Sequence, residues 1–497
     1  MKKTALLAVV LATTSGITTP ASAGGLYFSD RGVRPLGRGG AFVAGADDAG
    51  SIAYNPAGLA FTGRQFLLDA SWLQYSSTVQ RKQRITLTDP NTGQTYDSEQ
   101  TYPMVEGTTP VLPIPTLAYA NDFGLEKFNF AAALWAPYAA ITSYPERLGS
   151  TPAPQRYSLI SLNGSALAIG GVYASYRASP KFALGAGVEV LSGYFTTSVV
   201  MSTCPPDRFV CAPEDPDFDA LSRLKVGPII APSGIIGAIY APTRSIRLGA
   251  SFHLPFWIRS SADIDVRLPQ NPLFATAHQD GNQADVSFNL PWTLRAGVEG
   301  RIGDSTRIEG SVAVEGWNTH DRITVSPHDI ALSGVQGFPD HYRVNEISLE
   351  RGFQNNWSLH AGGEHTFDLS GYGLGLRAGA AYEKSAIPAP YLSATTIDLD
   401  KVTLSFGGSL HVGKWRFDGV YARVIGMPVD VSTGEARIPP VNPVRANPPA
   451  SPTYINAGHY GANANVYGVG LAYQFDAPDE PPTKPGSPEP PEPSSGD

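Results

Sequence analysis

Apolar and polar residues alternate along most of the chain between residues 64 and 475. Segments 372–383 and 402–412 show the pattern clearly. In the segment 284–300, alternate positions carry the apolar set Val286, Phe288, Leu290, Trp292, Leu294, Ala296 and Val298. A period of two is typical of strands with one apolar and one polar face, so the pattern predicts an all-β protein.

The alternating segments number fourteen, and the connections between them differ sharply in length. We place the strands at 64–80, 112–121, 126–138, 158–177, 181–200, 226–241, 245–266, 284–301, 305–318, 356–368, 372–383, 401–412, 415–426 and 463–475. The short connections are 121–124, 177–180, 241–244, 302–305, 368–371 and 412–414. The long ones are 81–111, 139–157, 201–225, 267–283, 319–355, 384–400 and 427–462.

Short turns that alternate with long loops are typical of outer-membrane barrels, in which the two kinds of connection lie at opposite ends. Closing the sheet also leaves no unpaired strand edge in lipid. Aromatic residues at strand ends fit interfacial girdles: Tyr372, Tyr382, Trp415, Tyr421, Tyr467 and Phe475. We therefore expect residues 64–475 to form a fourteen-stranded antiparallel transmembrane β-barrel. A soluble β-sandwich or propeller would alternate too, but the loop pattern and the N-terminus disfavour it.

The N-terminus predicts export. Lys2 and Lys3 precede an apolar run from Ala5 to Ala12, and residues 21–23 read Ala-Ser-Ala. This is the pattern of a secretory signal peptide, which we assign to residues 1–23. A bacterial outer-membrane location follows from the signal peptide and the barrel pattern together.

Composition narrows the function classes further. The net charge is −8 and only 16% of residues are charged, which argues against a nucleic-acid partner. Cys204 and Cys211 are the only cysteines, and in an exported loop we expect them to form a disulfide. Neither histidines nor cysteines show a metal-ligand spacing, so we expect no metal, no cofactor and no catalytic residues.

Residues 24–63 do not alternate. They are rich in Gly and Ala and contain the turn-breaking pair Asn55-Pro56. Several of their residues are too apolar for a solvated leader: Phe28, Phe42, Ile52, Tyr54, Leu59 and Phe61. We therefore expect a hatch (a plug) that folds into the barrel lumen.

In this segment the sequence resembles the FadL/TodX family of outer-membrane transporters. Its hatch motif is matched by Gly37, Arg38, Gly39, Asp47, Asp48, Asn55, Pro56, Ala57 and Gly58. Later stretches also resemble the family: Leu290-Pro291-Trp292, Trp317-Asn318, and residues 382–388 followed by 397–401. The resemblance extends to Phe475 and covers nearly all of the expected mature chain.

The resemblance implies a non-enzymatic, monomeric transporter that takes up long-chain fatty acids or aromatic hydrocarbons. Its partners would be a hydrophobic small molecule or fatty acid and the surrounding outer-membrane lipid and lipopolysaccharide. In relatives the ligand passes an inner pocket above the hatch and leaves sideways, through a gap at an inward kink of the third strand. Residues 128–135 contain no glycine, so the sequence does not predict that kink. A general diffusion porin or a structural barrel is the alternative, which the hatch motif disfavours.

Fatty-acid members of the family bind the carboxylate with basic residues, and this chain carries Gln354 where they can carry Lys. The remaining candidates for head-group contacts are Arg156, Arg343, Arg351 and Lys384, although each also fits a salt bridge. Residues 476–497 contain eight prolines and several acids, so we expect a disordered periplasmic tail.

Overall fold

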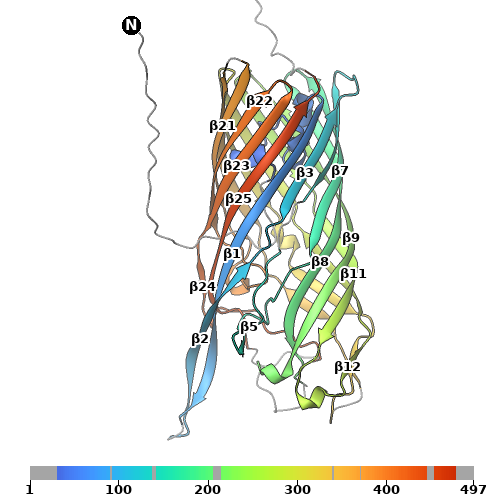
Figure 1. The fold of residues 1–497 in the computed structure, drawn as a ribbon, viewed down its shortest axis with the longest axis vertical. Coiled ribbons are helices and arrows are strands. Elements are labelled where there is room, and N and C mark those ends of the chain that lie inside the picture. Colours follow the sequence, from blue (N-terminus) through green and yellow to red (C-terminus); the bar gives the residue numbers. More distant parts are fainter. Residues whose placement is uncertain are drawn as a thin grey trace, which may run out of the picture.

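The protein is described here by a computed structural model that places residues 31–89, 92–136, 141–204, 214–337, 341–369, 371–444 and 453–476. Fourteen antiparallel wall strands form a closed barrel, because the first strand pairs along its length with the last (Figure 1). Twelve wall strands are continuous: β1 (Gln65–Thr88), β3 (Pro113–Asn121), β4 (Phe128–Trp135), β7 (Ala166–Ser179), β8 (Phe182–Ser202), β9 (Asp219–Tyr240), β15 (Thr306–Glu315), β20 (Asn356–Asp368), β21 (Tyr372–Glu383), β22 (Lys401–Val412), β23 (Trp415–Gly426) and β25 (Gly458–Gln474). Each of the other two consists of consecutive strands: β10 (Ile246–His253) with β11 (Phe256–Arg267), and β13 (Gln283–Leu290) with β14 (Thr293–Ile302). The predicted fold class is confirmed.

The remaining described elements lie in the long loops and in the N-terminal segment. The loop strands are β2 (Thr95–Thr108), β5 (Arg147–Leu148), β6 (Thr151–Pro152), β12 (His278–Asp280), β16 (Arg322–Pro327), β17 (Ala331–Ser333), β18 (His341–Arg343), β19 (Ile347–Glu350) and β24 (Val429–Val431). The helices are α1 (Val33–Gly37) and the 3₁₀ turns η1 (Ala49–Ala53), η2 (Pro56–Phe61), η3 (Pro216–Phe218), η4 (Pro272–Phe274), η5 (Trp317–Thr319) and η6 (Ala389–Tyr391). No helix of the described residues is long and apolar enough to cross a membrane.

The segment 81–111 is not the irregular loop that the sequence suggested. Strand β1 continues to Thr88 and pairs with β2, from Ser76↔Thr108 to Thr88↔Thr95. The two strands project beyond the barrel as a hairpin at its long-loop end (Figure 1). Each strand can hydrogen-bond the backbone N–H and C=O groups of the other, so the hairpin can continue beyond the barrel wall without a further neighbour strand.

The segment 284–300 does not keep one apolar face. Val286 and Leu290 are buried inside, whereas Leu294 (46% exposed) and Val298 (54% exposed) face outward. Pro291 has no N–H to donate, and the strand is interrupted between Leu290 and Thr293. Because side chains alternate with a period of two, a one-residue irregularity exchanges the faces.

The outer surface carries the apolar belt that a lipid-facing wall requires. Exposed apolar residues on it include Val172, Val188, Ile230, Phe406 and Val469. Aromatic side chains gather near the short-turn end, where Tyr473 lies 4.6 Å from Trp415 and 4.9 Å from Phe475 between ring centroids.

Candidate functional site

Residues 31–63, which we call the plug segment, lie inside the barrel toward its short-turn end (dark blue in Figure 1). Asp48 and Asn55 begin its two 3₁₀ turns, since their side chains accept hydrogen bonds from the N–H groups of Gly50 and Ala57. Pro56 occupies the first position of η2, where no N–H is needed. The turns therefore follow from local capping, and their position inside the wall follows from the contacts below.

The plug segment packs closely on several glycines of the wall. A Cβ at Gly379 on β21 would overlap the backbone of Arg38 and Gly39. A Cβ at Gly185 on β8 would overlap Pro56 and Ala57. Backbone therefore lies against backbone on opposite sides of the lumen.

Arg38 joins the plug segment to the wall. Its side chain is fully buried, and Nη2 lies 3.1 Å from Glu299 Oε2 on β14 and 3.2 Å from Glu309 Oε2 on β15. Its guanidinium also lies 5.5 Å from the ring centroid of Phe42. The two carboxylates offset much of the cost of burying this cation.

Glu309 also binds the plug backbone directly. Its Oε1 accepts from the N–H groups of Val43 (2.6 Å) and Ala44 (2.9 Å), and its Oε2 accepts from that of Gly45 (2.9 Å). Three consecutive amides therefore converge on one buried wall carboxylate. Such charge-assisted bonds are among the strongest that a protein makes.

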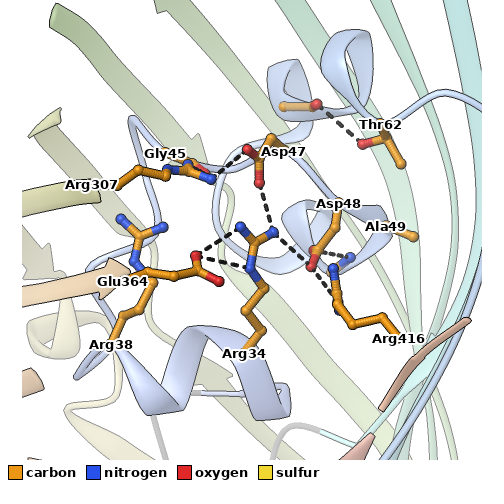
Figure 2. A network of polar contacts seen from close by, with 12 residues as sticks. Arg34, Arg38, Gly45, Asp47, Asp48, Ala49, Thr62, Arg307, Glu364 and Arg416 are labelled. Carbon is orange, nitrogen blue, oxygen red and sulfur yellow. Dashed lines mark hydrogen bonds and ion pairs between the residues drawn. The ribbon is translucent and has the colours of Figure 1, made fainter. Parts of the chain in front are cut away.

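A second network is centred on Arg34, which Figure 2 shows between three carboxylates. Its Nη1 lies 2.7 Å from Asp47 and 3.2 Å from Asp48, and its Nη2 lies 2.9 Å from Glu364 on β20. Two wall arginines complete the network: Arg307 lies 2.6 Å from Asp47, and Arg416 lies 2.8 Å from Asp48. The acidic pair of the hatch motif thus connects the plug segment to strands far apart in the wall.

Asn55 and Gly58 complete the motif. Nδ2 of Asn55 donates to the carbonyl oxygens of Val43 (2.9 Å) and of Ala238 on β9 (3.1 Å). A Cβ at Gly58 would overlap Ala46, so these two parts of the plug segment need glycine for their close contact. The predicted hatch-motif residues are therefore brought together in one buried assembly.

The lumen has two chemically different sides. The side formed by β14, β15 and β20–β23 carries the buried charged residues that hold the plug segment. The opposite side carries an apolar cluster, to which Ala49, Ile52 and Leu59 of the plug segment also belong. Its wall members include Ile169, Leu191, Ile229, Ile235, Phe256, Ile258, Val286 and Leu290.

Three of the four candidate head-group residues already have partners or lie exposed. Arg156 lies 2.7 Å from Asp219, and Lys384 lies 2.8 Å from Asp400. The side chain of Arg343 is 75% exposed and 4.0 Å from Asp329. These residues match the salt-bridge alternative better than a ligand site.

Arg351 differs from them. It is buried, and among the described residues no carboxylate lies within ion-pair distance of it. One Nη bonds Thr396, the guanidinium lies 5.0 Å from the ring centroid of Phe353, and Nε has no hydrogen-bond partner in the described structure. Burial lowers the pKa of Arg351 to about 10, so it remains a cation at neutral pH.

The surroundings of Arg351 are aromatic and apolar. Phe353 belongs to a cluster that includes Trp317, Ile387, Leu392, Ile397 and Leu399. His320 lies 5.0 Å from Phe353 between ring centroids, and its Nδ1 is 2.6 Å from the carbonyl oxygen of Asn289. Burial and the charge of Arg351 lower the pKa of His320 to about 3, so this imidazole is neutral. His320 could not be predicted as a neighbour of Arg351, because nothing local in the sequence links the two residues.

A small cavity lies between the plug segment and the charged side of the wall. Gly40, Val43 and Tyr54 line it from the plug segment, and wall residues such as Arg295 and Glu315 line it from the other side.

Cys204 is buried in the loop after β8, whereas Cys211 lies outside the described residues, so their pairing stays a prediction.

A closed fourteen-stranded barrel with an internal N-terminal segment defines a class of outer-membrane transport proteins. A family model described as "Outer membrane protein transport protein (OMPP1/FadL/TodX)" matches residues 14–476, and the chain belongs to this family. Its members are outer-membrane transporters of hydrophobic compounds, not enzymes. No curated protein matches the sequence.

Solved structures show the same fold at low identity. A Pseudomonas aeruginosa FadL homologue is 16% identical, with a TM-score of 0.66, and the match covers 91% of this chain and 100% of that one. The Pseudomonas putida toluene transporter TodX is 14% identical (TM-score 0.61; 91% and 100% covered). The Ralstonia pickettii toluene transporter TbuX is 13% identical (TM-score 0.54; 90% and 99% covered).

Proposed function

We propose that this protein takes up long-chain fatty acids, or hydrophobic molecules with a similar singly anionic head group, across the bacterial outer membrane. The observation that carries the proposal is Arg351, a buried cation with no carboxylate partner among the described residues. Burying an unpaired charge costs several kcal/mol, roughly, and a ligand carboxylate would offset that cost. The apolar residues around Phe353 would accept the adjoining alkyl chain, at roughly 0.8 kcal/mol per buried CH₂.

In this proposal residues 1–23 direct export, the plug segment acts as the hatch, and residues 476–497 extend into the periplasm. The ligand binds first near Arg351 and then moves along the apolar side of the lumen toward the plug segment. The ion pairs of Arg34 and Arg38 with the wall lie on the opposite side, so the apolar path does not cross them. A general diffusion porin would need an open polar lumen, which the packing of the plug segment on Gly185 and Gly379 disfavours.

The proposal is tested by equilibrium binding of radiolabelled oleate and toluene to the purified barrel. Arg351→Gln should weaken oleate binding about 10- to 100-fold, because one charge-assisted hydrogen bond contributes roughly 1.5–3 kcal/mol. Toluene has no head group, so its affinity should be unchanged. Arg343→Gln is the matched control, since that side chain is exposed.

Unchanged oleate binding in Arg351→Gln would remove the head-group assignment. A parent protein that binds toluene but not oleate would instead place it with carriers of aromatic hydrocarbons. In that case the apolar lumen would be the ligand site and Arg351 a structural cation.

A further inference from the structure

Within the described residues, the ladder between β9 and β10–β11 of the barrel wall is interrupted. The two sides pair from Tyr240↔Leu248 to Ile235↔His253 and again from Val226↔Ala262 to Leu221↔Arg267. Between these stretches, residues 227–234 and 254–261 form no ladder pairs with each other, and we call these two stretches the seam. β9 nevertheless keeps its ladder to β8 from Ile229 to Ile235, so the strand remains part of the wall.

Proline accounts for part of the interruption. Pro228 and Pro232 on β9 and Pro255 between β10 and β11 all fall in the seam, and none has an N–H to donate. Proline is normally confined to strand edges or bulges for this reason. Its presence on both sides of one strand pair therefore marks a place where the ladder is not made.

The faces on which opposite side chains lie account for the rest of the interruption. Val226 and Ile235 are nine residues apart, and so are His253 and Ala262, so the register is the same on both sides of the seam. At that register Ile230 would oppose Ile258, yet Ile230 is 70% exposed and points outward while Ile258 is buried inside. Directly opposite residues of an antiparallel ladder must share a face. The two strands therefore cannot pair here without a shift by one residue.

Only three hydrogen bonds cross the seam, and they lie at its ends. The N–H of Leu254 donates to the carbonyl of Gly234 (2.9 Å), and Oγ of Ser233 donates to the carbonyl of Leu254 (2.9 Å). At the other end, Oγ of Ser260 donates to the carbonyl of Pro228 (3.1 Å). Parting the strands between these ends would therefore break no ladder bond, whereas elsewhere in the wall it would expose polar backbone to lipid.

The seam joins the apolar side of the lumen to the lipid. Ile229 and Ile258 line it inside as members of the apolar cluster that also contains Ile52 and Leu59 of the plug segment. Ile230 and Trp257 (55% exposed) flank it outside. A Cβ at Gly237 on β9 would overlap Asn55, so the seam begins just beyond the plug segment on its long-loop side.

The height of the seam also fits an exit into the membrane. Pro232 lies eight residues from Tyr240 at the short-turn end of β9. With about 3.3 Å per residue and a tilt of about 40°, this is roughly 20 Å along the barrel axis. That distance lies within an apolar band about 25 Å tall.

We propose that the transported hydrophobic molecule leaves the lumen sideways through the seam between β9 and β10–β11. It passes between Ile229 and Ile258 and enters the lipid beside Ile230 and Trp257. This inference rests on the proposed function and assigns its exit. The third strand shows no comparable interruption within residues 128–135, where β4 pairs with β7 throughout.

The test is a disulfide that closes the seam. Ser233→Cys with Pro255→Cys places one cysteine on each side of it, and mass spectrometry verifies the crosslink. Ala238→Cys with Ala250→Cys is the matched control, because these residues already form a ladder pair of the same strands. Both variants keep Cys204 and Cys211, so reduction affects that pair equally in each.

Uptake of radiolabelled oleate is measured in cells before and after reduction, and oleate binding is measured on the purified proteins. Opening of the seam would limit the transport rate. The seam variant should therefore take up oleate about ten-fold more slowly when its disulfide is oxidised than when the same disulfide is reduced. Its binding should equal that of the parent, and the control should change by less than about two-fold in either assay. Normal uptake by the oxidised seam variant would overturn the exit while leaving the proposed function in place. A parent protein that neither binds nor takes up oleate would instead refute the proposed function.

A second measurement does not depend on the crosslink. A fatty acid carrying a diazirine at its chain end is photoactivated on the parent protein during uptake, and the labelled peptides are identified. Label on residues 229–233 or 256–260 supports the seam. Label on another part of the wall, with none on these residues, would contradict it.

Discussion

Replacing Glu309 by Gln should loosen the plug segment without changing the barrel. The carboxylate accepts four hydrogen bonds, from the N–H groups of Val43, Ala44 and Gly45 and from Arg38 at 3.2 Å. Gln keeps only one acceptor oxygen, so its NH₂ group would face two of these donors. Each lost charge-assisted bond is worth roughly 1.5–3 kcal/mol.

The two lost bonds together should destabilise the docked plug segment by about 3 kcal/mol. We use the lower value for each bond because Arg38 keeps its contact with Glu299. Such a loss raises the population of the released plug segment roughly 100-fold. Hydrogen exchange followed by mass spectrometry would report it as faster exchange of the amides at Val43, Ala44 and Gly45. Planar-bilayer recordings should show brief openings that the parent lacks.

Glu99→Gln is the control for this change of charge. Glu99 lies in the exposed hairpin, 3.3 Å from Lys82, with a side chain that is 44% exposed. An exposed pair of this kind contributes at most about 1 kcal/mol, so neither readout should move. The assignment of Glu309 as the main wall contact of the plug segment would be refuted by two results together. Hydrogen exchange at residues 43–45 would be as slow in Glu309→Gln as in the parent, and the conductance would be unchanged.

Three further results are expected. Gly379→Ala should destabilise the docked plug segment by roughly 1–3 kcal/mol because its Cβ would overlap Arg38. Gly419→Ala, which meets open space, should not; thermal unfolding compares the two, and equal stability would contradict the close contact. His320 should not make oleate affinity depend on pH between 6 and 8, because its pKa of about 3 keeps the imidazole neutral in that range. A change in oleate affinity with a midpoint near pH 6.5 would contradict this, since it would show that the imidazole becomes protonated. Deletion of residues 24–60 should open an ion-conducting pore in planar bilayers, and a deletion variant that stays closed would show that loops alone block the lumen.

Strand number and barrel closure could be predicted from the sequence because each wall strand shows its alternation locally. The interruptions were not predicted. Residues 245–266 and 284–301 each read as one strand, yet Pro255 and Pro291 divide them. A proline in an alternating segment signals a break, but which face each half presents depends on its neighbours.

The plug segment shows a similar division between local and distant effects. Its composition predicted that it packs inside the barrel, and the capping residues Asp48 and Asn55 are visible locally. The partners of Arg38 are Glu299 and Glu309, which lie more than 250 residues away along the chain. Only the closed barrel brings them together.

The head-group candidates show why burial and pairing require the structure. Arg156 and Arg351 look alike in the sequence, since both lie in long connections, 139–157 and 319–355. Asp219 neutralises Arg156, whereas the neighbours of Arg351 are Phe353, Thr396 and a neutral His320. That difference arises from contacts between separate loops and leaves no pattern in the sequence.

The most direct test of the central claim is to identify the molecules that co-purify with the barrel. The protein is extracted in a mild detergent, and bound molecules are identified by mass spectrometry beside an Arg351→Gln preparation. We predict enrichment of long-chain carboxylates in the parent and their loss in the variant. A parent barrel that carries no hydrophobic ligand and conducts ions as a large open pore would contradict the account.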